Sequence, residues 1–99
     1  MAYTEGDDGA LFDWDEANES HIERHGVDRW EATEALFDPD RYPLSRGWHG
    51  GEYRYALVGR TEAGRTLTIV FARRGPKVRV ITARDASQRE ATLYRRSRR

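Results

Sequence analysis

The spacing of apolar residues changes from a helical repeat to strict alternation about halfway along the chain. At the start, residues 11–14 alternate apolar and polar side chains, which predicts a short edge strand. The helical repeat that follows predicts a helix from about Asp15 to His25, with Asp13 or Asp15 as its N-cap. Gly26 comes next, where a left-handed C-cap is expected.

A second helix is predicted over about residues 29–37, because Asp28 and Glu31 have the spacing of a capping box. The pair Asp38-Pro39 is expected to end this helix. Residues 38–51 contain two prolines and three glycines, so this segment is predicted to be a loop.

Alternation begins after that segment and predicts three strands, over residues 53–59, 67–73 and 77–83. Turn-forming residues at positions 61–64 and at Gly75-Pro76 separate the strands. Connections this short join neighbouring antiparallel strands, so the three are expected to form a meander.

A last helix is predicted to start near Ser87, where Glu90 completes another capping box, and to run to about Arg96. The order β-α-α-β-β-β-α indicates an α+β domain in which helices pack on one face of a small antiparallel sheet. A single domain is expected over residues 1–99, with residues 1–9 and 96–99 as mobile tails.

Composition argues against several classes of protein. The chain is 37% hydrophobic and 11% aromatic, which is typical of a folded globular domain rather than a disordered segment. No apolar run approaches the length of a membrane span, and the N-terminus lacks the basic and apolar regions of a signal peptide. There is no cysteine, so disulfide and thiolate chemistry are excluded, which fits a cytoplasmic protein.

The net charge of zero conceals two oppositely charged halves. Residues 1–40 carry two arginines and thirteen carboxylates, a balance of −11, and residues 41–99 have a balance of +11. A strongly cationic half suits a polyanionic partner, because neutralised phosphates release counterions. Lys77 is the only lysine, and guanidinium groups suit bidentate phosphate contacts better than ammonium groups do.

The basic residues of the second half are expected to form a shared surface, because few acidic residues accompany them. Five lie on or beside the predicted strands: Arg54, Arg60, Arg73, Arg79 and Arg84. Alternation in residues 77–84 turns Arg79, Ile81 and Ala83 to one face and the intervening residues to the other. Neither face is purely polar, so alternation leaves open which arginines converge. The arginine-rich end, residues 95–99, is a solvated tail or an electrostatic tether.

Two histidines, His21 and His25, share one face of the first predicted helix. Metal ligation would need a further ligand, for which only His49 and scattered carboxylates are available. Packing at the rim of the core explains His21 better. His25 ends the helix beside Gly26, where the dipole stabilises an imidazolium. It is therefore a candidate acid, base or phosphate ligand, and a C-capping role explains it as well.

The chain resembles the BrnT family in a set of short motifs, which together cover about residues 11–95. In the first half they are Phe12-Asp13-Trp14-Asp15, Asn18, His21-Ile22, His25-Gly26-Val27, Glu34 and Phe37-Asp38-Pro39. In the second half they are Tyr53-Arg54, Gly59-Arg60, Gly64-Arg65, Arg73, the run from Val78 to Arg84, Glu90 and Tyr94. No single motif is specific, but their order and spacing are.

The resemblance implies a fold, an activity and partners. BrnT proteins are toxins of type II toxin–antitoxin modules, with a RelE-like fold, that block translation by cutting RNA. The resemblance thus implies an RNA substrate, no cofactor, and neutralisation by an antitoxin with a ribbon-helix-helix domain. Operator DNA is bound through the complex of the two proteins. An antitoxin that covers the basic surface is expected to present an acidic segment.

The sequence departs from the family pattern at two lysines. Many members carry lysine immediately before the His-Gly pair, where this chain has Arg24. Another family lysine, early in the first helix, is replaced by Asn18 or Glu19. Arginine keeps the charge but barely deprotonates, so it does not readily serve as an acid or base.

These features lead to the hypothesis of a metal-independent endoribonuclease. The 2′-hydroxyl of RNA is the nucleophile, and the protein positions it and stabilises the charge of the phosphorane. We expect Arg60, Arg73, Arg79 and Arg84 to provide that stabilisation. His25 is the candidate for proton transfer, and Glu90 is a candidate base whose capping role also explains it. His21, Arg24, Arg54 and Lys77 are expected to bind RNA.

Two alternatives remain open. The chain could be a catalytically degenerate module that binds RNA or the antitoxin, which the missing lysines favour. It could also be a DNA-binding repressor acting alone. Against this stands the acidity of the first two predicted helices, because an acidic recognition helix suits a phosphate-lined groove poorly.

Overall fold

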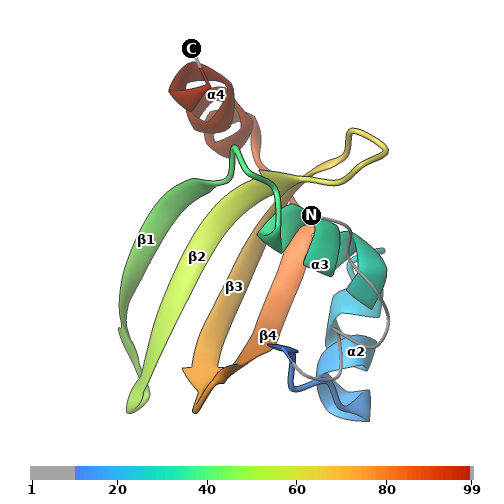
Figure 1. Ribbon diagram of the computed structural model, residues 1–99, viewed down its shortest axis with the longest axis vertical. Helices are drawn as coiled ribbons and strands as arrows, with labels where there is room; N and C mark the ends of the chain where they lie inside the picture. Colours follow the sequence, from blue (N-terminus) through green and yellow to red (C-terminus); the bar gives the residue numbers. More distant parts are fainter. Residues whose placement is uncertain (1–10, 99) are drawn as a thin grey trace.

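The computed structural model describes residues 11–98, which form a four-stranded antiparallel sheet and three helices (Figure 1). The elements are α2 (Glu16–Glu23), α3 (Arg29–Leu36), β1 (Tyr42–His49), β2 (Glu52–Arg60), β3 (Thr66–Arg74), β4 (Lys77–Asp85) and α4 (Gln88–Ser97). The strands follow one another across the sheet in chain order. The α+β class and the predicted order of the helices and of β2 to β4 are confirmed. Within the described range, no helix is long and apolar enough to cross a membrane.

The predicted tails have different outcomes. Residues 1–9 lie outside the described part of the chain. At the other end α4 continues through Ser97, so residues 96 and 97 are helical rather than part of a tail.

The predicted loop over residues 38–51 is wrong, because most of it forms the edge strand β1. This strand pairs antiparallel with β2, with a bulge between Pro43 and Ser45. An edge strand tolerates proline beside a bulge, since no neighbour needs its missing N–H. Gly50 and Gly51 have φ of 57° and 82° and form the two-residue turn of the β1–β2 hairpin. The prolines and glycines thus mark an edge strand and a hairpin.

The helix ends follow the local signals closely. Each helix begins with a capping box: Asp15 with Asn18, Asp28 with Glu31, and Ser87 with Glu90. α2 ends at Glu23, two residues before the predicted end, and Gly26 has the left-handed φ of 73° expected beyond a helix C-terminus.

The predicted edge strand over residues 11–14 is reduced to one bridge. Phe12 pairs in parallel with Val78 of β4, and the Asp13 N–H donates to the Val78 carbonyl at 2.9 Å. The Phe12 side chain is buried, and its ring centroid lies 6.0 Å from those of Trp14 and Phe37. This segment therefore closes one side of the core instead of extending the sheet.

The main core lies between the sheet and the helices α2 and α3. It contains Phe12, Ile22, Val27, Ala32, Ala35, Leu57, Leu67, Ile69, Val80 and Ala83. We call the sheet surface that carries Leu57 and Ile69 the helix face. Gly59 lies on it beneath α3, where a Cβ would stand 2.1 Å from the Ala35 carbonyl oxygen. Only glycine permits this approach.

The prediction that the helices share one face is wrong for α4, which packs on the opposite face. The side chain of Thr68 points to the face opposite that of its neighbour Ile69. Thr68 Oγ1 donates to Glu90 of α4 at 2.8 Å. Tyr94 of α4 is 1% exposed, and Val58 beneath it is fully buried. Figure 1 shows α4 at one end of the sheet, away from α2 and α3.

A hydrogen bond pins α4 to the chain before β1. The Tyr94 hydroxyl donates to Asp38 Oδ2 at 2.5 Å, and the same oxygen accepts from the Arg60 N–H at 2.8 Å. Burial and the bond to Asp38 raise the pKa of Tyr94 to about 12. Burial alone would raise the pKa of Asp38, but the bonds from Tyr94, Asp40 and Arg60 lower it.

Strict alternation fails in β4, where a bulge adds one residue. Thr82 pairs with Val70 of β3 and Val80 pairs with Phe71, so Ile81 is the extra residue. Val80 and Ala83 therefore both face the core. Two residues on either side of the bulge that strict alternation would place on opposite faces therefore lie on the same face.

Candidate functional site

The bulge in β4 brings two of the predicted arginines to one face. Arg79 pairs with Ala72 and Arg84 with Thr68, two positions of equal parity on β3. Their side chains therefore leave the sheet on the side of Thr68, where α4 packs. Without the extra residue Arg79 and Arg84 would point to opposite sides.

Two arginines of β2 join them. Arg54 pairs with Ala72 from the other side, and Arg60 lies six residues further along the same strand. The Arg60 guanidinium lies over the Tyr94 ring of α4, 5.4 Å from its centroid. We call the surface that carries Arg54, Arg60, Arg79 and Arg84 the arginine face.

The arginine face has cations at both ends and small side chains between them. Arg54 and Arg79 flank β3, and the spacing of neighbouring strands puts their Cα atoms about 10 Å apart. The row of Arg84 is four residues, or about 13 Å, further along β3. The half-buried side chains of Ala56, Val70 and Thr82 lie between the rows. This arrangement offers an extended anion several cationic contacts without large side chains in its path.

Glu52 holds the two arginines at the hairpin end. It accepts from Arg54 Nε at 3.1 Å and is in close contact with Arg79 Nη2. These hydrogen bonds, the one from Arg79 first, lower the pKa of Glu52. The Arg79 side chain is 21% exposed. Glu52 therefore fixes the direction of Arg79 while leaving other guanidinium donors available.

Two guanidinium nitrogens on this face are buried without a hydrogen-bond partner among the described residues. They are Nε of Arg60 and Nε of Arg79. Buried donors are nearly always paired in folded proteins, so these two are exceptions. Both atoms are covered by the protein, so a phosphate would meet the outer guanidinium nitrogens of these arginines, with charge-assisted bonds.

Glu90 holds Arg84 in a dense network. Arg84 donates through Nη1 and Nη2 to both Glu90 carboxylate oxygens, at 2.8 and 3.0 Å. Thr68 Oγ1 and the Ser87 N–H also donate to Glu90, each at 2.8 Å. The bonds from Arg84, ahead of the others, lower the pKa of Glu90 to about 2. A carboxylate so acidic and so fully occupied suits a positioning role better than that of a base.

This network predicts a loss of stability in acid. The pKa of Glu90 is about 2 in the folded chain against an ordinary 4.5, so its contribution is complete above pH 4.5 and disappears as the pH falls towards 2. Glu90→Gln should lower the free energy of unfolding by roughly 2–3 kcal/mol at pH 7. The deficit should shrink to a small part of its size by pH 2.5, because the unfolded carboxyl then binds a proton while the folded one, with a pKa of about 2, is only partly protonated. Urea unfolding of both proteins at pH 7, 4 and 2.5 measures it, and a pH-independent deficit would contradict the prediction.

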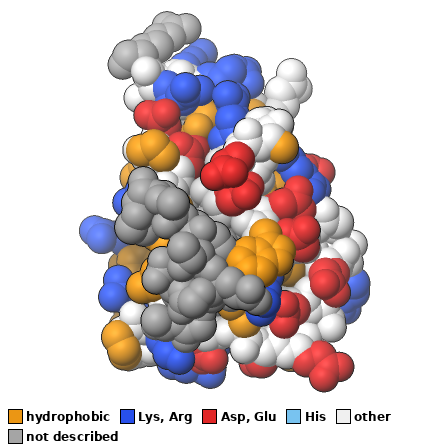
Figure 2. All heavy atoms as spheres, turned by 45° about the vertical axis from the view of Figure 1, so that its right-hand side comes forward, with side chains coloured by type: hydrophobic (Ala, Val, Ile, Leu, Met, Phe, Trp, Pro, Cys, Tyr) orange, Lys and Arg blue, Asp and Glu red, His pale blue; other side chains and the backbone are white. Residues whose placement is uncertain are grey.

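Other cations surround the arginine face. Arg89, Arg95, Arg96 and Arg98 are exposed on or just after α4. Lys77, the first residue of β4, lies on the same face of the sheet as Arg79. Figure 2 shows basic side chains around the helix at one end of the molecule and acidic side chains over the side that carries α2 and α3. The split of charge along the sequence is thus partly kept in space on this face, although Arg65, Arg74 and Arg98 pair with carboxylates of the first half.

Four predicted site residues lie elsewhere. Arg73 pairs with Val78 and has the parity of Ile69, so it is exposed on the helix face. His21, Arg24 and His25 belong to the end of α2, whose Ile22 packs in the core of the helix face. The structure does not bring these four to the arginine face.

The two histidines of α2 contact each other, with ring centroids 5.5 Å apart. Among residues 11–98, His, Asp and Glu side chains nowhere gather in a group of three that could hold a metal ion. His25 is exposed, and the Gly26 carbonyl beside it accepts from Arg65 Nη1 at 2.7 Å.

The structure adds His49, which the sequence suggested only as a possible metal ligand. His49 pairs with Glu52 across the β1–β2 turn, and directly paired residues share a face. It is exposed beside the carboxylate that binds Arg54 and Arg79. The signal for this placement was present in Gly50-Gly51, a two-residue hairpin turn between His49 and Glu52.

Comparison with known proteins identifies one family. The family described as "Ribonuclease toxin, BrnT, of type II toxin-antitoxin system" matches residues 14–90. The matched range contains α2, α3, the whole sheet and the first turn of α4, and thus every residue of the arginine face. No curated protein matches the chain. With more than three quarters of its length matched, the chain belongs to the BrnT family of ribonuclease toxins.

Proposed function

We propose that this protein is a metal-independent endoribonuclease that binds its RNA across the arginine face. The observation that carries the proposal is the convergence of Arg79 and Arg84, through the bulge in β4, with Arg54 and Arg60. A surface of four guanidinium groups with small side chains between them suits a single-stranded polyanion.

The reaction needs little from the protein beyond charge and position. The RNA 2′-oxygen attacks the adjacent phosphorus, the bond to the 5′-oxygen breaks, and a 2′,3′-cyclic phosphate and a 5′-hydroxyl result. One proton leaves the 2′-oxygen and one is added to the 5′-oxygen. The phosphorane between them carries extra negative charge, which preorganised guanidinium donors stabilise without reorganising.

The contacts of each arginine suggest its role. Arg79 is assigned to the phosphorane, because Glu52 fixes its direction. Arg60 lies about 20 Å along the sheet from Arg79 by the rise of a strand, so it is assigned to a neighbouring phosphate. Arg84 and Arg54 are held by Glu90 and Glu52 and are assigned to neighbouring phosphates. These assignments keep Arg73, which lies on the helix face, out of the reaction.

Proton transfer has two candidates. His49 is assigned first, because it shares the face of Arg54 and Arg79. His25 remains the candidate favoured by the family motif, although α2 lies on the other side of the sheet. Comparing His49→Ala with His25→Ala in one cleavage assay decides between them, because only the variant that lacks the proton carrier should flatten the pH–rate profile.

The finer identity of the partner rests on resemblance alone. We propose a ribbon-helix-helix antitoxin and operator DNA bound only through the complex of toxin and antitoxin. A short neighbouring reading frame that encodes such a domain is the expected observation.

Cleavage of a defined single-stranded RNA by the purified protein tests the proposed function. Cleavage should persist in EDTA, leave 2′,3′-cyclic phosphate ends, and fail on the same RNA with 2′-O-methyl groups, which lack the nucleophile. Loss of cleavage with EDTA would overturn metal independence, and cleavage of the methylated RNA would overturn the 2′-hydroxyl mechanism.

A second candidate function is a binding module without nuclease activity. It is favoured by the internal pairing of Arg54, Arg79 and Arg84 with Glu52 and Glu90, which offsets part of the charge needed for catalysis. Arg24, in place of the family lysine, favours it too. Growth arrest on induction of the wild-type gene, relieved by Arg79→Ala, supports the nuclease, whereas harmless expression supports the binding module.

A further inference from the structure

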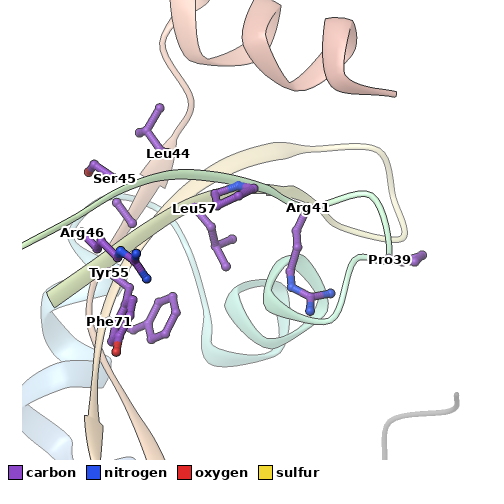
Figure 3. Close-up of a pocket in the computed structure, with 10 residues that line it drawn as sticks. Pro39, Arg41, Leu44, Ser45, Arg46, Tyr55, Leu57 and Phe71 are labelled. Carbon is purple, nitrogen blue, oxygen red and sulfur yellow. The ribbon is translucent and has the colours of Figure 1, made fainter. Parts of the chain in front are cut away.

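The sheet has a second exposed surface, on the part of the helix face that α2 and α3 leave open. A groove of about 720 Å³ lies there, beside β1 and β2, with Pro43, Tyr55, Leu57 and Phe71 in its lining. In Figure 3, Tyr55, Leu57 and Phe71 lie together on one side, and Arg41 reaches down beside α3. A smaller hollow of about 280 Å³ shares Arg41, Leu57 and Phe71 with it. We call the two together the aromatic groove.

A row of aromatic rings extends the groove to the β1–β2 hairpin. Ring centroids are 5.2 Å apart for Trp48 and Tyr53, 5.3 Å for Tyr53 and Tyr55, and 5.3 Å for Tyr55 and Phe71. Trp48 at the end of the row is 72% exposed. Contiguous exposed apolar surface of this kind marks interaction sites, and tryptophan, tyrosine and arginine provide most of the energy at protein interfaces.

The rim of the aromatic groove is cationic and lacks carboxylate partners. Arg41 and Arg46 line the groove, and Arg73 lines the adjoining hollow. Within residues 11–98 none of the three forms an ion pair, and Arg41 donates only to the Asp38 backbone carbonyl at 3.2 Å. The arginine face differs, since Glu52 and Glu90 pair with three of its cations. Complementary charge for the rim must therefore come from a partner.

The ring geometry favours a protein over RNA. Trp48, Tyr53 and Tyr55 meet edge to face, with interplanar angles of 77° and 75°, and Tyr55 stacks on Phe71. Neighbouring rings therefore cover part of the π-surface of the half-buried Tyr53, Tyr55 and Phe71, on which bases would stack. Pro43 and Leu57 add apolar lining without donors or acceptors for base edges. An acidic segment with apolar side chains matches both the lining and the rim.

We propose that the aromatic groove binds an acidic, amphipathic segment of the antitoxin. The inference rests on the proposed toxin function for the identity of the partner, and it replaces the expectation that the antitoxin covers the basic surface. The groove and the arginine face lie on opposite sides of one sheet. Affinity for the antitoxin and cleavage of RNA are therefore separable by substitution.

The double variant Trp48→Ala/Arg46→Glu tests the inference, because both side chains are exposed on β1 and contribute nothing to the core. The full-length product of the neighbouring antitoxin gene is the probe, titrated calorimetrically into the full-length toxin. The Kd should rise by roughly 30-fold or more. The control Arg96→Glu makes the same change of charge on α4 and should leave the Kd unchanged, as should Arg79→Ala. Circular dichroism melts check that each variant is folded.

Several outcomes would overturn the proposal. An unchanged Kd for the double variant, or a loss of binding in Arg79→Ala, places the antitoxin on the arginine face. A toxin dimer that the double variant dissociates makes the groove a self-interface. Weakened RNA binding by the double variant makes it a path for RNA. Failure of the proposed function is a separate result: an antitoxin that maps to the groove of a toxin without nuclease activity leaves this inference intact.

Discussion

Arg79→Ala should slow RNA cleavage by about 100-fold or more while leaving the protein folded, because removal of one preorganised donor from a developing oxyanion costs that much. Arg79 is placed on the arginine face by the bulge and held in direction by Glu52. Its side chain is 21% exposed, so guanidinium donors other than those bound to Glu52 can reach a phosphate. The effect should fall on kcat rather than on KM, since the proposed contact strengthens as charge develops on the phosphorane.

Two further variants sharpen this result. Arg46→Ala removes an exposed arginine from the opposite face and should cleave RNA at the wild-type rate. Arg79→Lys keeps the charge but loses the planar fork, so it should recover only part of the activity. An Arg79→Ala protein that retains more than a third of the wild-type kcat would remove Arg79 from the mechanism.

Gly59→Ala should strongly destabilise the protein. The new Cβ would stand 2.1 Å from the Ala35 carbonyl oxygen and 2.8 Å from its carbon. Both are backbone atoms of α3, so relief requires the helix to move. Overpacking of this kind costs about 3 kcal/mol, which for a domain of this size lowers Tm by more than about 10 °C.

Gly47→Ala is the matched control, because Gly47 lies in β1 with open space around its Cβ position. It should change Tm by little and can raise it slightly, since alanine restricts the unfolded chain. Thermal melts of the two variants and the wild type provide the comparison. Equal Tm values for the two variants would show that α3 does not press on β2 as described.

The helices could be predicted because their signals are local. Each capping box needs two residues three positions apart, so Asp28 and Glu31 predict the start of α3 from the sequence alone. The face of the sheet on which a helix packs is not encoded by such local signals. Glu90 was correctly placed as a cap, but its contact with Thr68, which sets α4 on the arginine face, depends on tertiary packing.

The errors in the sheet have a common physical source, which is that register is set between strands. Pro43 and the glycines indicated a loop, yet an edge strand accepts them because one of its sides has no strand to pair with. Because residues 38–51 were predicted to be a loop, His49 was not predicted to lie beside the strand arginines. The bulge at Ile81 was equally hidden, because the pairing of Phe71 with Val80 has no signature within β4 itself.

Ile81 also links the length of a strand to its chemistry. A point mutation at Arg79 or Arg84 removes one guanidinium, but deletion of a single residue between them restores a regular pleat and turns one arginine through the sheet. Both arginines would still be present in the sequence, yet they would no longer meet the same RNA. Related toxins that keep the two arginines but have one residue fewer in β4 should therefore be inactive, and one inserted residue at that point should restore them.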